Sequence, residues 1–213
     1  MAQRGRPRSF DRTTALRRAM EVFWRKGYDN ASMADLTAAM GINPPSLYAA
    51  FGSKEGLFRE AVALYAETEG SGIWEGVPAA PTARAAMEHL LRATALAYTK
   101  GPEPLGCLIV LGAPQAECAS PAIRDDLRRR RADNVRILEE RLRRAVAEGE
   151  LPAHVDCTAV ANFYATVQHG MSIRARDGAT REELLSVADC AMAAWDRLTS
   201  TASRNRDPSE KSK

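Results

Sequence analysis

The chain has 213 residues, of which 45% are hydrophobic and 27% are charged, and its formal net charge is +3 at pH 7. This balance is typical of a globular protein of one or two domains and excludes wholesale disorder. No apolar run approaches the roughly 20 residues that span a bilayer, and the basic first ten residues have no apolar segment behind them, which argues against a secretory signal.

The positive charge is concentrated near the N-terminus. Residues 1–60 hold ten Lys or Arg and six Asp or Glu, which leaves a net charge of +4. A basic arm ahead of the first helix suggests an anionic partner, whereas the alternative is a solubilising leader; charge alone does not separate the two. The five bases of the first 17 residues are Arg4, Arg6, Arg8, Arg12 and Arg17.

Helical signals recur throughout, without a convincing alternating strand. The first helix is expected from about Asp11, which can cap it, to Lys26, where Gly27 supplies a stop. A second helix is expected to begin at Ser32, in a capping-box pattern with an acidic third residue, and to end at Gly41.

The next stretch, NPPSLYAAF, places two prolines together. Proline suits the first turn of a helix, where its missing N–H has no partner anyway. We therefore expect Asn43 to cap a short helix that opens with Pro44 and Pro45 and reaches Phe51. A fourth, longer helix should follow, capped by Ser53.

The remainder of the chain also has helical spacing. A stretch GSGIWEGVPAAP is predicted to be a flexible separator, the run RRRR at 128–131 to be a solvated face, and the tail 201–213 to be disordered. The expected helices cover about 82–100, a short apolar segment near 106–113, then 121–148, 156–176 and 181–199.

The first three helices suit a helix-turn-helix, in which the start of the second helix of the motif meets base edges. At helical spacing Leu47 and Phe51 point inward, which leaves an outward face containing Tyr48, whose hydroxyl can donate to a phosphate. Lys54 and the helix start at Ser32 can do likewise. The alternative is a generic helical hairpin in which Tyr48 covers the core.

The segment SMADLTAAMGINPPSLYAAFGSKEGL, from Ser32 to Leu57, resembles the DNA-binding domain of the TetR family of bacterial transcriptional regulators. The resemblance implies an all-α protein of about nine helices, with a helix-turn-helix domain over residues 1–52 and a ligand-binding and dimerisation domain over 53–200. It also implies a homodimer formed through the last two helices, a palindromic double-stranded DNA operator, and a cytoplasmic repressor that a small-molecule effector releases.

Carried onto this sequence, the resemblance implies phosphate contacts and base readout from the second and third helices. Proline at position 45 departs from the small or polar residue of many members, so we expect sparse hydrogen bonding to bases and a reliance on thymine methyls and DNA shape. The basic arm is expected to add minor-groove contacts. The predicted DNA-binding residues are Arg4, Arg6, Arg8, Ser32, Met33, Asn43, Pro44, Pro45, Ser46, Tyr48 and Lys54.

The resemblance also implies an effector pocket in the C-terminal domain. Cys107 follows Gly106 at the start of an apolar segment, a setting similar to that of electrophile-sensing members, so one hypothesis is that Cys107 reacts with electrophiles or oxidants. An inert buried cysteine is the alternative. The candidate pocket residues are Met87, Leu91, Tyr98, Cys107, Phe163, Val167 and Met171.

No catalytic, metal or cofactor site is predicted. The histidines have no second ligand at metal-binding spacing, and the chain contains no P-loop, dinucleotide fingerprint or G-x-S-x-G. The four cysteines lie far apart without a C-x-x-C pair, which indicates a reducing setting. Two alternatives to a ligand-responsive repressor stay open: an architectural DNA-binding protein without a ligand, and a helical enzyme.

Overall fold

The computed structural model describes residues 10–101, 103–113 and 120–200. These residues form twelve helical segments and no strand, which confirms the all-α class. Eight of the segments have eight residues or more, and the other four are short. The predicted tail 201–213 lies outside the described residues, as does Cys118.

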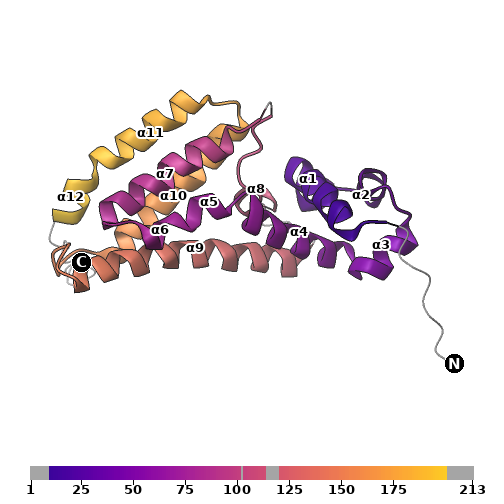
Figure 1. The fold of residues 1–213 in the computed structure, drawn as a ribbon, viewed down its shortest axis with the longest axis horizontal. Coiled ribbons are helices and arrows are strands. Elements are labelled where there is room, and N and C mark those ends of the chain that lie inside the picture. The colour runs from indigo at the N-terminus through magenta and orange to yellow at the C-terminus, as the bar shows by residue number, and fades with distance from the viewer. Residues whose placement is uncertain (1–9, 102, 114–119, 201–213) are drawn as a thin grey trace, which may run out of the picture. The chain divides into compact units, whose positions relative to one another are not determined.

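The chain divides into two compact units, and the first, called the N-terminal unit below, comprises Met1–Ser71 and Leu105–Arg131. Phe23, Leu36, Leu47 and Phe58 come from four different helices and are completely buried, so the helices share one apolar core. The helices of this unit, labelled in Figure 1, are α1 (Arg12–Asn30), α2 (Met33–Met40), α3 (Pro44–Phe51), α4 (Lys54–Thr68) and α8 (Leu108–Leu111).

A side-chain cap begins each of the first four helices. Oxygens of Asp11, Ser32, Asn43 and Ser53 accept backbone N–H groups two or three residues later, at 2.8–3.0 Å. Each bond satisfies a donor that the helix itself leaves without a partner. The predicted starts of these helices are therefore confirmed, with the two prolines in the first turn of α3.

Gly27 breaks α1 as expected, and the break has a structural use. Its φ of 74° is a left-handed conformation that favours glycine, and it separates the last residues of α1 from the main part. Beyond the break, the Tyr28 N–H donates to the Gly112 carbonyl at the end of α8 at 2.8 Å. On the main part, Trp24 Nε1 donates to the Gly106 carbonyl at 2.9 Å. The segment around α8 is thus fastened to α1 at both ends.

The second compact unit, called the C-terminal unit, comprises Gly72–Pro104 and Ala132–Lys213. Helix α9 (Pro121–Ala147) begins in the N-terminal unit and continues into this one, and α5 (Ser71–Trp74) begins at the boundary. The other helices of this unit are α6 (Gly76–Ala79), α7 (Ala83–Tyr98), α10 (Cys157–Arg176), α11 (Arg181–Ala193) and α12 (Trp195–Ser200).

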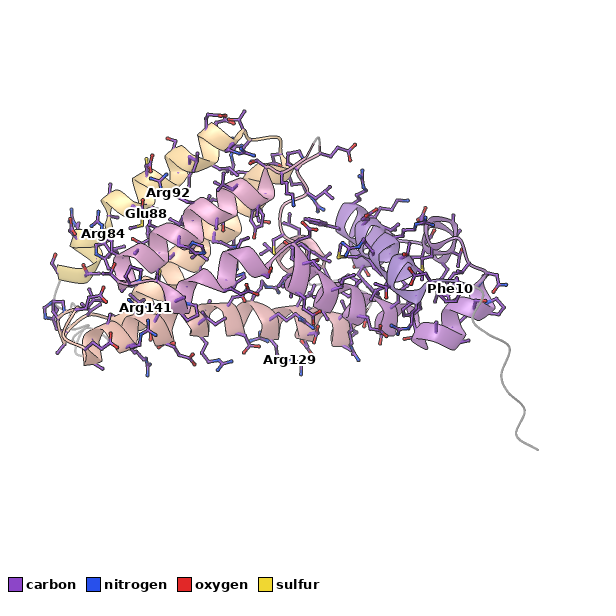
Figure 2. All side chains as sticks on the ribbon, viewed as in Figure 1. Phe10, Arg84, Glu88, Arg92, Arg129 and Arg141 are labelled. Atoms are coloured by element: carbon purple, nitrogen blue, oxygen red, sulfur yellow. The ribbon has the colours of Figure 1, made fainter. Side chains whose placement is uncertain are left out.

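Helices α7, α10 and α11 pack on one another. Side-chain hydrogen bonds and ion pairs also join the α7 region to α11 and α12. Arg92 meets Asp189 at 2.7 Å and Arg84 meets Asp196 at 3.1 Å, while Thr99, just after α7, accepts from Arg181 at 3.2 Å. As the residue numbers rise from Arg84 to Thr99, those of their bonding partners fall from Asp196 to Arg181, so α7 and α11 are antiparallel. Figure 2 shows Arg84, Glu88 and Arg92 along one edge of α7.

The start of α7 is fixed by a buried ion pair in the same unit. The side chain of Arg141 on α9 is almost fully buried and pairs with Glu150 at 3.2 Å. The Glu150 carboxylate also accepts the backbone N–H of Ala83, the first residue of α7. A guanidinium at this depth requires such a partner, because burying an unpaired charge is costly.

Two expectations for this unit are wrong. The separator GSGIWEGVPAAP is not a flexible linker, because it contains α5 and α6 and buries Ile73 and Val77. The His89 ring also packs closely against Gly76, where a Cβ would collide with it. The last helix is likewise not continuous to residue 199: it is divided at Ala194, whose N–H bonds to carbonyls two and three residues earlier.

Candidate functional site

Helix α3 presents a two-sided surface. Leu47 and Phe51 are buried on its inner side, whereas Pro44, Pro45 and Tyr48 are exposed, with 49% of Tyr48 accessible. An aromatic side chain exposed to this extent beside two prolines contributes little to the core. The outward face predicted for the start of this helix is therefore present.

Arg12 holds the far end of α3 in place. Its guanidinium lies 4.5 Å from the centroid of the Phe51 ring and within 2.7–2.8 Å of both carboxylate oxygens of Glu60 on α4. It also donates to the Ala50 carbonyl at 3.4 Å. Although it belongs to the basic N-terminal cluster, Arg12 therefore serves to position α3.

The cap of α3 limits what Asn43 can offer a ligand. Its Oδ1 accepts the Ser46 N–H at 2.8 Å, so the side-chain group left for other partners is the Nδ2 amide, a donor. Ser46 itself is half-buried. The four predicted readout positions, Asn43 to Ser46, thus present one amide donor and two proline rings as their main exposed groups.

The start of α2 is a closed hydrogen-bond network. The Ser32 hydroxyl accepts the Asp35 N–H at 3.0 Å and donates to the Asp35 carboxylate at 2.7 Å, which Lys26 also reaches at 2.7 Å. The hydrogen bond from Lys26, followed by those from Ser32, lowers the pKa of Asp35 to about 2. The Ser32 hydroxyl donates its proton to Asp35. Of the two residues predicted to contact phosphate here, Ser32 and Met33, the donor left for an incoming anion is therefore the backbone N–H of Met33.

Lys54, at the start of α4, is held against an aromatic ring. Its Nζ lies 4.4 Å from the centroid of the Tyr28 ring, and the residue is half-buried. A cation over a ring face keeps its charge while its position is fixed. The remaining predicted DNA-binding residues, Arg4, Arg6 and Arg8, lie outside the described residues.

The arginine run of α9 divides into two kinds of residue. Arg128 and Arg129 are exposed, as expected of a solvated face, and Arg129 is labelled in Figure 2. For Arg131 the expectation is wrong, because its guanidinium donates to the Ile109 carbonyl of α8 at 2.8 Å. Burial lowers the pKa of Arg131, and its interaction with Cys107 raises it to a lesser extent.

Cys107 belongs to this same part of the N-terminal unit. It is buried at the N-cap position of α8. Burial, and then its neighbour Cys107, raise the pKa of the Tyr65 hydroxyl well above its ordinary value. Trp24 packs edge-on against Tyr65, with 4.9 Å between ring centroids. The thiol therefore has a phenol and a guanidinium as its polar neighbours.

The other predicted pocket residues lie in the C-terminal unit. Met87, Leu91 and Tyr98 on α7 and Met171 on α10 are buried. Phe163 and Val167 on α10 are only half-buried, and Cys107 belongs to the N-terminal unit.

The sequence interpretation missed two buried polar residues among these positions, Thr94 and Gln168. For Thr94 the sequence did carry a signal of a buried polar residue, because Thr94 precedes Tyr98 by one helical turn on an otherwise apolar face.

None of the helices over the described residues is long and apolar enough to cross a membrane.

Two family models match the chain. The model described as bacterial regulatory proteins, tetR family, matches residues 15–61, and the model of the tetracyclin repressor-like C-terminal domain matches residues 84–184.

Curated relatives and solved structures match almost the whole chain. The HTH-type transcriptional repressor ComR of Escherichia coli K12 is 36% identical over 92% of this chain and 93% of its own. The HTH-type transcriptional repressor BdcR of the same organism is 33% identical over 88% of this chain and 90% of its own. A cysteine mutant of the TetR family transcriptional regulator CifR, complexed with 26-bp double-strand operator DNA, is 50% identical with a TM-score of 0.85, and the match covers 89% of this chain and 100% of CifR.

Proposed function

The chain belongs to the TetR family of bacterial regulatory proteins, and on this premise we propose that it is a cytoplasmic, homodimeric repressor that binds a palindromic operator and is released by a small molecule. The observation that carries the proposal is the exposed start of α3, with Tyr48 outward and Leu47 and Phe51 anchored behind it. Its relatives are transcriptional regulators, so the helical enzyme is set aside.

The phosphate contacts would come from three helices of the N-terminal unit. The Tyr48 hydroxyl, the Lys54 ammonium and the Met33 N–H are each donors at a helix start or on an exposed face. Such contacts fix the register of a protein on duplex DNA without reading its sequence. Arg4, Arg6 and Arg8 would add contacts to the neighbouring minor groove.

Base readout would be sparse. The Asn43 Nδ2 is a donor that suits acceptors of a base edge, whereas Pro44 and Pro45 offer only apolar contact with thymine methyl groups. Proline also fixes the backbone before DNA arrives, which reduces the entropy lost on binding. Sequence preference beyond these contacts would come from the shape of the operator.

The dimer would form through α10 and α11. Ile173 is 50% exposed and Val187 is 38% exposed, and a Cβ added at Gly170 would meet no atom within 4 Å. At helical spacing Phe163 and Val167 share the face of Gly170, so we assign these two half-buried residues to the dimer interface in preference to the effector pocket. Two-fold symmetry would set the reading helices one DNA turn apart, about 34 Å, or a multiple of it.

Release requires an effector that binds more tightly to a conformation unable to bind the operator. The affinity for the operator can fall only by the ratio of the effector's affinities for the two conformations. A chemical trigger is also proposed at Cys107, a buried thiol that lies beside Arg131 and Tyr65. An electrophile such as N-ethylmaleimide should then abolish operator binding by the native protein but not by the Cys107→Ser variant. Equal inhibition of both proteins would refute the trigger.

The experiment for the whole proposal is selection of binding sites from a random duplex pool by the purified protein. A palindrome should emerge, and the logarithm of the binding constant should fall steeply with that of salt concentration as phosphate contacts are lost. An unselected pool from a folded dimer would contradict the proposal and favour the alternative, an architectural DNA-binding protein without a ligand.

A further inference from the structure

A polar cluster lies inside the C-terminal unit, between α7 and α10. Thr94 and Gln168 are 0% and 1% exposed, and Tyr98 is almost as deeply buried. The Gln168 Nε2 donates to the Tyr98 hydroxyl at 2.5 Å. Within the part of the chain that the structure describes, two atoms of the cluster have no hydrogen-bond partner, the Thr94 Oγ1 and the Gln168 Oε1.

These two atoms belong to the same region of the α7–α10 interface. Thr94 and Tyr98 are one turn apart on α7, and a long side chain on a helix leans toward the preceding turn. We therefore expect the Tyr98 side chain, whose hydroxyl is bonded to Gln168, to lie over the turn that carries Thr94. Native interiors keep few buried polar atoms without a partner, because each retains the cost of losing its water.

Apolar side chains lie next to the cluster along both helices. Its buried neighbours along the two helices include Leu91 and Met171, and Arg92 on α7 is turned to the exposed edge, where it pairs with Glu88 and Asp189. A charged ligand would lose its hydration without gaining a counter-charge. An uncharged ligand with an apolar body meets no such penalty.

We propose that Thr94, Tyr98 and Gln168 form the effector site and that its ligand class is a small uncharged alcohol. One hydroxyl group satisfies both atoms, because it donates its proton to the Gln168 Oε1 and accepts from the Thr94 hydroxyl. A ketone or aldehyde only accepts and leaves the Gln168 Oε1 unpaired. An ammonium could donate to both atoms, but it would be buried without a counter-charge. This inference rests on the proposed function and names the class of its effector.

The test uses four probes with one ring and different polar groups: benzyl alcohol, benzaldehyde, benzoate and benzylamine. Benzyl alcohol should raise the melting temperature of the full-length protein in a dose-dependent way, as a ligand of the folded state does. The other three should act at least about tenfold more weakly, as expected when a buried polar atom stays unpaired or a charge is buried without a counter-charge.

Two nearly isosteric variants, Thr94→Val and Gln168→Met, remove one orphaned atom each. Each should weaken the apparent affinity for benzyl alcohol about tenfold. The control Thr68→Val, at an exposed position of α4, should not change it. Without a probe, Thr94→Val should melt at the same or a higher temperature, because it removes an unsatisfied hydroxyl. That readout also shows that the variant folds.

Equal shifts from all four probes, no shift from any, or an unchanged response in both variants would each overturn the assignment. Operator binding is measured separately with the same proteins. A protein that binds benzyl alcohol through these residues but never selects a DNA sequence would refute the proposed function alone. A protein that binds its operator but ignores the alcohol would refute this inference alone.

Discussion

The N-terminal and C-terminal units differ in where their informative groups lie. In the N-terminal unit the candidate binding groups, such as Tyr48 and the Met33 N–H, stand at helix starts and on an exposed face. In the C-terminal unit the corresponding groups, Thr94 and Gln168, are buried without a full set of partners. A surface that meets DNA is assembled by local capping signals, whereas an interior that accepts a small molecule depends on which helices pack together.

Among the changes that would sharpen this comparison, the largest loss of stability is expected where α8 packs against α1. Gly27→Ala forces an L-residue into a φ of 74° and brings its Cβ to 3.2 Å from the Gly112 carbonyl oxygen. We expect a loss of about 2–3 kcal/mol in the free energy of unfolding, measured by urea denaturation.

The matched control is Gly52→Ala, which has a φ of 75° but no atom within 4 Å of the added Cβ. It should cost about 1–2 kcal/mol, the strain of the positive φ alone. Equal losses in the two variants would show that the close approach of α1 and α8 contributes nothing.

The second effect concerns the exposed face of α3. Tyr48→Ala should weaken operator binding about tenfold or more, because a hydrogen bond to a charged phosphate is lost. Its melting temperature should change little, since surface substitutions rarely destabilise. Tyr48→Phe separates the hydroxyl from the ring, and fluorescence anisotropy with labelled operator measures all three proteins. A Tyr48→Ala protein that loses stability in step with affinity would make Tyr48 a core residue after all.

A smaller effect is expected on α9, where the arginine run has two kinds of residue. Arg131→Gln should cost about 1–2 kcal/mol of stability by removing a charged donor from the Ile109 carbonyl. Arg128→Gln, at an exposed position of the same run, should stay within about 0.5 kcal/mol of the native protein. Thermal unfolding of the pair decides whether the run is one solvated face.

The smallest effect is expected at the start of α2. Folding lowers the pKa of Asp35 from 3.8 to about 2, so its contribution to stability is present above pH 4 and is lost as the pH falls through 2. Asp35→Asn should therefore melt below the native protein at neutral pH, and the difference should shrink between pH 4 and pH 2. A difference that does not depend on pH would mean that the carboxylate charge is not what stabilises the turn.

The same contrast explains how far the sequence could lead. Caps and stops act over three or four residues, so Ser32, Asn43, Gly27 and the exposure of Tyr48 could be predicted from spacing alone. The half-buried hydrogen bond from Arg131 to the Ile109 carbonyl, 22 residues away, could not be predicted. An arginine in a basic run has the same local pattern whether it is solvated or bonded to another helix. The pairing of Tyr98 with Gln168 spans 70 residues, and no local signal specifies such a partner.

The packing of the stretch around Gly76 was missed for a related reason. Glycine and proline indicate a flexible segment when read locally. Here Gly76 gives room to the His89 ring, and the segment is ordered by a residue that follows it in α7.

Backbone hydrogen exchange of the full-length protein, alone, with its selected operator and with benzyl alcohol, tests most directly whether the two units bind different partners. We predict that operator DNA slows exchange in the first turns of α2, α3 and α4, and that the alcohol slows it in α7 and α10 around Thr94 and Gln168. Operator binding that leaves the first turns of α2 and α3 unprotected would contradict the account.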